Sequence, residues 1–222
     1  MSNRLAIFDC DGTLVDSQGN ICIAMEQAFA AAKLAAPSRE ATRRVVGLSL
    51  VEAMQQLHPD ADDAFHAELA EHYRAAFFAM RQEGTVYEPL YEGIVEAIEA
   101  IDGAGWLLGV ATGKSDRGLN AVLDGHGILP RFVALHTADR HPSKPHPSMI
   151  DACIADAGAS PETTVMIGDT SYDMAMAKAA GVVAIGVAWG YHPPEELRAA
   201  GADMVLGHAG EITDALKELS WS

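Results

Sequence analysis

The sequence predicts an α/β fold: a Rossmann-like parallel sheet forms the core domain, and a small all-helical cap domain is inserted after the first strand. Two observations support this fold. Short apolar runs alternate with helical stretches along most of the chain, which is the pattern of a parallel sheet flanked by helices. One long stretch between the first run and the second has helical patterns but no strand pattern.

Five apolar runs are expected to form strands, and a weaker sixth follows them. They are Leu5–Phe8, Trp106–Ala111, Phe132–Leu135, Val165–Ile167 and Val182–Val187, followed by Met204–Leu206. In open parallel sheets, ligands bind beyond the carboxyl ends of the strands. The residues that follow each run are therefore the first candidates for a functional site.

The stretch between the first two runs is expected to form a cap of four helices. Their patterns cover Ile21–Ala35, Arg39–Val46, Leu50–Leu57 and Ala64–Met80. Ser49 and Glu52 have the spacing of a capping box, which predicts that the third helix begins there. Linkers are expected near Thr13–Gln18 and Gln82–Pro89 because Gly84 and Pro89 interrupt helices. We therefore expect a core domain of residues 1–16 and 85–222 and a cap domain of residues 17–84.

Composition limits the kinds of partner. The chain has 31 acidic residues against 15 Lys and Arg, a formal charge of −16, which disfavours nucleic acids and anionic membrane surfaces. Its three cysteines include no C-x-x-C pair, so we expect a reduced, cytoplasmic protein. We also expect a soluble protein without a membrane span, since no uncharged run is long enough. The sequence does not indicate the oligomeric state.

The strongest local signal is a pair of carboxylates, Asp9 and Asp11, directly after the first apolar run. Two carboxylates at a strand end can divide the work, one binding metal and attacking while the other transfers protons. Gly12 allows a turn that aims backbone amides at a phosphoryl group. An Asp-Gly turn after a strand is also common without any function.

Three further polar residues follow other strands. Thr112 follows the second run, Lys144 lies after the third, and Asp169 follows the fourth. Taken singly, Thr112 and Asp169 could be helix caps, and Lys144 could be a solvated loop residue. Their joint occurrence beside the carboxylate pair favours one metal and phosphate site.

The order and spacing of four motifs resemble the haloacid dehalogenase superfamily of phosphohydrolases, and especially its phosphoglycolate phosphatase-like members. The motifs are Asp9-Cys10-Asp11-Gly12-Thr13, Thr112-Gly113-Lys114, Ser143-Lys144-Pro145 and Gly168-Asp169-Thr170-Ser171-Tyr172-Asp173. The resemblance spans nearly the whole chain and includes Trp189-Gly190-Tyr191 and Ala199-Ala200-Gly201-Ala202-Asp203.

The resemblance implies a magnesium-dependent phosphatase acting on a small phosphorylated metabolite. Asp9 would attack phosphorus and form an aspartyl-phosphate, and Asp11 would act as the acid and base. Mg²⁺ would be held by Asp9, the backbone carbonyl of Asp11, and Asp169. Lys144 would neutralise the phosphoryl oxygens and hold Asp9, and Thr112 would donate a hydrogen bond to the same phosphoryl group.

The remaining site residues have supporting roles. Gly12, Thr13 and Gly113 would line the phosphate site. Asp173, on the first turn of the next helix, would support the metal through water or orient Lys144. In the cap, Arg43 and Arg44 could hold a substrate carboxylate as an arginine fork, although a solvated pair at a helix end is an equal alternative.

Two groups of residues are left out of the predicted site. Cys10 should point away from the acids and lie buried. His136, His141 and His146 lie near Lys144 in the sequence, but they have no matching ligand cluster, so we interpret them as loop histidines.

The expected substrate is 2-phosphoglycolate, and several alternatives remain. Pyrophosphatase, nucleotidase or sugar-phosphate phosphatase activity needs the same core. A phosphomutase is disfavoured because Ile21 stands where that branch has a cap histidine. A dehalogenase would need neither Asp11 nor Asp169. A phosphonate-cleaving enzyme would need a cap lysine, and Lys33 is expected within a helix. A catalytically silent binding or regulatory protein is the alternative from another class.

Overall fold

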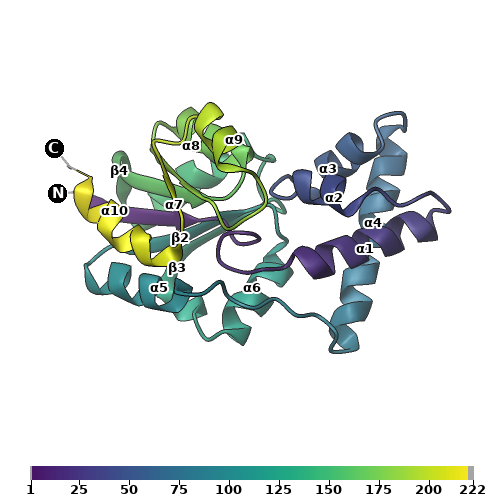
Figure 1. The fold of residues 1–222 in the computed structure, drawn as a ribbon, viewed down its shortest axis with the longest axis horizontal. Helices are drawn as coiled ribbons and strands as arrows, with labels where there is room; N and C mark the ends of the chain where they lie inside the picture. Colours follow the sequence, from purple (N-terminus) through teal and green to yellow (C-terminus); the bar gives the residue numbers. More distant parts are fainter. Residues whose placement is uncertain (1, 220–222) are drawn as a thin grey trace.

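The computed structural model describes residues 2–219 and contains one six-stranded sheet, with strand order β3-β2-β1-β4-β5-β6 and every neighbouring pair parallel (Figure 1). The strands are β1 Asn3–Phe8, β2 Leu107–Thr112, β3 Phe132–Thr137, β4 Ala159–Gly168, β5 Val183–Val187 and β6 Met204–Leu206. The predicted α/β sheet fold is confirmed.

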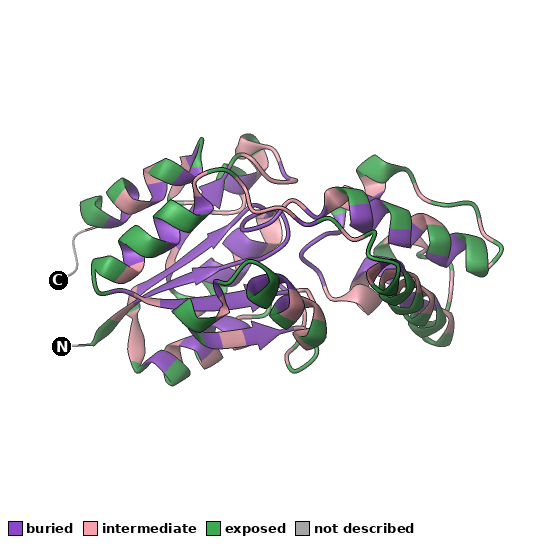
Figure 2. Cartoon of the chain, turned by 90° about the horizontal axis from the view of Figure 1, so that it is seen from below, coloured by how far each residue is buried: buried purple, intermediate pink, exposed green. Residues whose placement is uncertain are grey.

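Helices cover both faces of this sheet because side chains alternate along each strand. Ala6 and Phe8 of β1 pack toward α5, α6 and α10, whereas Leu5 and Ile7 pack toward α7, α8 and α9. These helices span α5 Ile94–Gly103, α6 Asp116–Gly125, α7 Ser148–Ala157, α8 Ser171–Ala180, α9 Pro194–Ala199 and α10 Ile212–Glu218, with short 3-10 turns η1 Leu129–Arg131 and η2 Ala209–Glu211. Figure 2 shows the buried strands between helices whose outer faces are exposed.

The predicted helical cap lies between β1 and β2 and stands at one end of the sheet (Figure 1). It consists of α1 Gln18–Ala31, α2 Arg39–Arg44, α3 Leu50–Leu57 and α4 Asp63–Gln82. The cap has its own apolar core, in which Met25, Phe29, Met54 and Leu69 are buried. The division into residues 1–16 with 85–222 and residues 17–84 stays a prediction.

The strand order places the site. From β1 the chain moves outward through β2 to β3, then returns to the other side of β1 with β4. The carboxyl ends of β1 and β4 therefore form the switch point where ligands bind in open α/β sheets. Asp9 follows β1 and Asp169 follows β4.

Two details of the cap differ from the sequence predictions. Helix α1 ends at Ala31 instead of Ala35, and Lys33 lies after it with a left-handed φ of 61°. The prediction that Lys33 lies within a helix is therefore wrong. Helix α3 begins beside Ser49 as predicted, but the side chain of Ser49 makes no capping hydrogen bond. The backbone N–H of Ser49 donates to Ser143 Oγ of the core domain instead (2.7 Å). No helix within residues 2–219 is long and apolar enough to cross a membrane.

Candidate active site

The turn after β1 presents two acids at the end of the sheet. Asp9 is 1% exposed, and its backbone N–H donates to the carbonyl of Ile167 at the end of β4. Gly12 has φ +91°, a conformation that favours glycine. Its N–H donates to the carbonyl of Val15, so the amide of Gly12 itself closes the turn. That this turn aims other amides at a phosphoryl group stays a prediction.

Asp169 is held from two sides. Its Oδ1 accepts from Thr13 Oγ1 and its Oδ2 accepts from the backbone N–H of Tyr191, each at 2.9 Å. The space around this carboxylate admits no extra carbon: a Cβ on Gly12 would lie 2.2 Å from Asp169 Oδ2, and one on Gly190 would lie 2.1 Å from Asp169 Cβ. Thr13, predicted to line the phosphate site, orients Asp169 through its side chain.

Lys144 is a fully buried cation beside Asp9. Its Nζ lies 2.9 Å from Asp9 Oδ1 and donates to Asp173 Oδ1 at 2.6 Å. Burial acts to lower the pKa of Lys144, but the two carboxylates outweigh it and the pKa is raised. Lys144 therefore stays charged.

Asp173 orients Lys144 and also caps helix α8. Its Oδ2 accepts from the N–H and the hydroxyl of Thr170, and Thr170 accepts from the N–H of Asp173 in a capping box. Both carboxylate oxygens of Asp173 thus have protein donors. Of the two supporting roles predicted for Asp173, the one through Lys144 has direct contacts.

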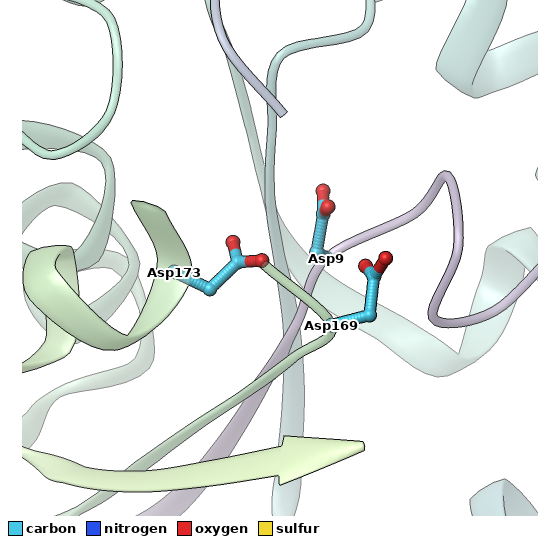
Figure 3. A group of neighbouring side chains, drawn as sticks. All are labelled: Asp9, Asp169 and Asp173. Atoms are coloured by element: carbon cyan, nitrogen blue, oxygen red, sulfur yellow. The ribbon is translucent and has the colours of Figure 1, made fainter. Parts of the chain in front are cut away.

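The carboxylates of Asp9, Asp169 and Asp173 offer oxygens within 4.8 Å of one another, and Figure 3 shows Asp9 and Asp169 pointing the same way with Asp173 reaching toward them from its helix. Burial raises the pKa of Asp9 to about 6, with Asp173 adding to the rise, although Lys144 opposes it. Burial, with Asp173 and Asp9, also raises the pKa of Asp169. This cluster of acids needs more positive charge than Lys144 supplies.

These residues fit a divalent cation. Within residues 2–219, no hydrogen bond of regular geometry reaches either oxygen of Asp9, despite the close approach of Lys144. Three carboxyl groups share one ammonium in this buried space, so a further cation would favour their ionised forms. Hard cations such as Mg²⁺ prefer carboxylate oxygens of this kind.

Asp11 lies in a second ionic cluster that the sequence analysis did not assign. Lys114 Nζ donates to Asp11 Oδ1 (2.7 Å) and to Glu88 Oε1 (2.8 Å), and Ser17 Oγ donates to the same oxygen of Asp11. Burial acts to lower the pKa of Lys114, but Asp11 and Glu88 outweigh it, so the pKa is raised. Lys114 stands within the motif Thr112-Gly113-Lys114, and that position was the one signal available for it.

A cavity of about 250 Å³ lies over Asp9 and Asp11, between the sheet and the cap. Thr112, Gly113 and Lys114 form its core wall, and apolar residues of the cap form the opposite wall: Ile21, Met25, Val45, Val46, Leu48, Ala53 and Phe77. The cap closes directly onto Gly113, where a Cβ would lie 2.5 Å from the carbonyl oxygen of Leu48. The Thr112 hydroxyl accepts from the N–H of Lys114 and keeps its own hydrogen free to donate.

A family model described as haloacid dehalogenase-like hydrolase matches residues 6–187. The chain belongs to this family. A Dickeya dadantii protein named "Probable phosphatase IndB" is 36% identical, with 97% of this chain and 94% of the relative covered. A Vibrio vulnificus phosphoglycolate phosphatase is 28% identical, with 96% of each covered. The crystal structure of a predicted phosphatase from Clostridium acetobutylicum has the same fold, with a TM-score of 0.88 over 99% of this chain and 100% of that one, at 24% identity.

Among the residues predicted to bind substrate in this haloacid dehalogenase-like hydrolase, the two cap arginines are placed elsewhere. Neither Arg43 nor Arg44 is among the residues that line the cavity. Arg44 reaches over the outside of the cap to Glu196 of α9 (2.6 Å). The solvated-pair alternative describes Arg44, since its side chain does not line the cavity and pairs with Glu196 instead.

The residues excluded from the site behave largely as expected. Cys10 is buried in the apolar core, and burial raises its thiol pKa well above the usual value. His136 lies on strand β3, not in a loop as predicted, with His141 Nε2 and Asp156 Oδ2 each 2.9 Å from its ring nitrogens. The group of side chains within residues 2–219 that could hold a metal ion consists of Asp9, Asp169 and Asp173 and includes no histidine.

Proposed function

We propose that this phosphatase of the haloacid dehalogenase-like family is magnesium-dependent and hydrolyses a small phosphomonoester through an aspartyl-phosphate on Asp9. The observation that carries the proposal is the state of Asp9. Its carboxylate is buried at the switch point, lacks a regular hydrogen bond within the described residues, and faces the cavity beside Asp169 and Lys144. A buried carboxylate held there beside one cation, with no regular hydrogen bond, is suited to accept a metal ion and a phosphoryl group.

Asp9, Asp169 and the backbone carbonyl of Asp11 would hold Mg²⁺, while Asp173 stays engaged with Lys144 and Thr170. When bound, the ion would neutralise the phosphoryl group and the attacking carboxylate together. Thr13 and Tyr191 fix the direction of Asp169. Such supporting contacts orient ligands and tune metal affinity.

In the first step, an oxygen of Asp9 bonds to phosphorus as the bond to the leaving oxygen breaks, and Asp11, acting as the general acid, gives a proton to that oxygen. In the second step, Asp11 takes a proton from water, whose oxygen bonds to phosphorus as the bond to Asp9 breaks. Lys144 and the Thr112 hydroxyl would neutralise and orient the phosphoryl oxygens. Each role uses position and charge, because a carboxylate is a weak nucleophile on its own.

We propose 2-phosphoglycolate as the first substrate to test. The relative from Vibrio vulnificus that is named phosphoglycolate phosphatase supports this choice. The cations that line the cavity within residues 2–219 are Arg74 of α4, which also pairs with Glu71 of the same helix, and Lys114, which also binds Asp11 and Glu88. These two replace Arg43 and Arg44 as candidates to hold the substrate carboxylate.

The apolar cap wall favours a second candidate. A glycolate group would leave much of this wall without a partner, whereas a nucleoside or another partly apolar alcohol would cover it. Burial of apolar surface stabilises binding by roughly 25 cal/mol per Å². Nucleoside 5′-monophosphates are therefore the competing substrate class, ahead of pyrophosphate and hexose phosphates.

The test is steady-state hydrolysis with and without Mg²⁺, over a panel of phosphoglycolate, nucleoside monophosphates, hexose phosphates, pyrophosphate and an aryl phosphate. We expect Mg²⁺-dependent turnover of at least one substrate in the panel. Asp9→Asn should lose this turnover, whereas a matched surface variant, Asp156→Asn, should keep it. Turnover that persists in Asp9→Asn would contradict the mechanism. The absence of turnover for every ester would favour a binding protein.

A further inference from the structure

Lys114 joins the predicted acid to the linker that returns from the cap. Its side chain is 8% exposed and lies between Asp11, which is 11% exposed, and Glu88, which is 5% exposed. The distances from Nζ are 2.7 Å to Asp11 Oδ1 and 2.8 Å to Glu88 Oε1. A buried cation shared by two carboxylates fixes the positions of both.

Glu88 is itself tied to the cap. It lies after α4, the last helix of the cap, and its Oε2 accepts from Arg81 in the final turn of that helix at 3.0 Å. Lys114 also contacts α4 directly, with Nζ 5.8 Å from the centre of the Phe77 ring. Movement of α4 relative to the sheet would therefore displace Glu88 and Lys114.

The outgoing linker reaches the same acid. Ser17, the residue that precedes α1, donates to Asp11 Oδ1, the oxygen that also accepts from Lys114. No hydrogen bond within the described residues reaches Asp11 Oδ2, and Asp11 lines the cavity. Both linkers thus hold one oxygen of Asp11 and leave the other for the substrate.

We propose that Lys114, braced by Glu88, is a positioning residue that aims Asp11 Oδ2 at the leaving oxygen when the cap is closed. This inference rests on the proposed function, in which Asp11 gives a proton to that oxygen as its bond to phosphorus breaks. Lys114 keeps its own protons throughout. Cap closure and the placement of the acid are then one event, so an open enzyme does not present its acid correctly.

The test compares two esters that differ in their need for an acid. An alkyl phosphate such as β-glycerol phosphate has a poor leaving group that must be protonated, whereas the nitrophenolate of p-nitrophenyl phosphate leaves without a proton. General acids contribute about 10²–10⁴-fold, and misplacement by about 1 Å can cost about 10²-fold. We expect Glu88→Gln to lower kcat/KM, which reports the steps up to departure of the leaving group, by about 10-fold or more for β-glycerol phosphate and by less than about 3-fold for p-nitrophenyl phosphate.

Three further variants make the outcome decisive. Asp11→Asn should show the same preference for the aryl ester in a stronger form. The double variant Lys114→Met/Glu88→Gln removes one positive and one negative charge together, so the net charge of the buried cluster is unchanged, and its preference for the aryl ester should match or exceed that of Glu88→Gln. Lys178→Met, which breaks the exposed pair with Asp203, should leave both rates unchanged.

Equal losses of kcat/KM on both esters would overturn the inference, because they would indicate a structural ion pair. Unchanged rates in Glu88→Gln and in the double variant would also overturn it. If the wild-type enzyme hydrolysed neither ester, the failure would lie with the proposed function.

Discussion

The surroundings of Asp9 oppose ionisation of its carboxyl group. The side chain is buried, Asp173 adds negative charge, and Lys144 compensates only in part. Burial of an uncompensated charge is costly, so such groups shift their pKa or find a counter-ion. The raised pKa of Asp9 shows that its ionised form lacks sufficient counter-charge, which the proposed cation would supply.

Protons should compete with Mg²⁺ at this site. With the pKa of Asp9 raised to about 6, we expect Mg²⁺ affinity to rise between about pH 5 and pH 7 and to level off above that range. Isothermal titration calorimetry across this range measures the effect. An affinity that stays constant would contradict it.

The same shift affects the stability of the metal-free protein. Because the folded pKa of Asp9 lies above the unfolded value, the native state binds more protons between about pH 4 and pH 6, and the contribution of Asp9 to stability falls as pH rises through this window. Urea unfolding of the metal-free protein measures this loss. Asp9→Asn is the control, since it removes the part of the pH dependence that comes from Asp9.

Gly190 tests how tightly Asp169 is packed. Its φ is not in the left-handed region, so alanine would be tolerated by the backbone, but the added Cβ would lie 2.1 Å from Asp169 Cβ. We expect Gly190→Ala to displace Asp169 and to lower Mg²⁺ affinity and kcat by about 10²-fold or more. Gly103→Ala, with no atom within 4 Å of the new Cβ, should retain both.

At the scale of elements, the segment between α2 and α3 closes the site. Its backbone carbonyls at Gly47 and Leu48 lie against Gly113, and Ser49 bonds to Ser143 of the core domain. Arg44 adds an exposed ion pair with Glu196 on the outer side. The contacts between the cap and the core thus lie within this segment and at Arg44 just before it. The cations that line the cavity, Arg74 and Lys114, come instead from α4 and from the loop after β2.

This arrangement allows the roles of Arg44 and Arg74 in substrate binding to be distinguished by experiment. For 2-phosphoglycolate, we expect Arg44→Met to change KM by less than about 3-fold, since exposed ion pairs contribute little. Arg74→Met should raise KM by about 10-fold, because it removes a charge-assisted partner of the carboxylate. Steady-state kinetics on both variants measures these changes in KM. A larger rise in KM for Arg44→Met than for Arg74→Met would indicate that Arg44 holds the substrate carboxylate.

Much of the fold and of the catalytic centre could be predicted because both follow from local patterns. Apolar runs define the strands, and the residue after each run falls at one edge of a parallel sheet. Lys114 could not be assigned in this way, since its partner Glu88 comes from a linker whose path is set by tertiary packing. The capping box at Ser49 marks the start of α3 correctly, but its hydrogen bonds do not form, for a similar reason. The backbone N–H of Ser49 donates to Ser143, a residue distant in the sequence.

At the scale of the whole molecule, a chain with a net charge of −16 places part of that negative charge in a buried cluster of three acids. A bound divalent cation should therefore stabilise the native state markedly. At 100 times Kd the added stability is about 2.7 kcal/mol, which for a chain of this size raises Tm by about 5–11 °C. Differential scanning calorimetry with Mg²⁺ and with EDTA measures the shift, and Asp169→Asn should show little of it.

The central claim is that Asp9 becomes phosphorylated during turnover. Acid quenching of the Mg²⁺-loaded enzyme within its first turnovers of an aryl phosphate, followed by peptide mass spectrometry, tests this claim directly. We predict one phosphoryl group on the peptide that contains Asp9, lost on incubation at alkaline pH and missing in Asp9→Asn. Steady turnover without phosphorylation of Asp9, or with the phosphoryl group on another residue, would contradict the account.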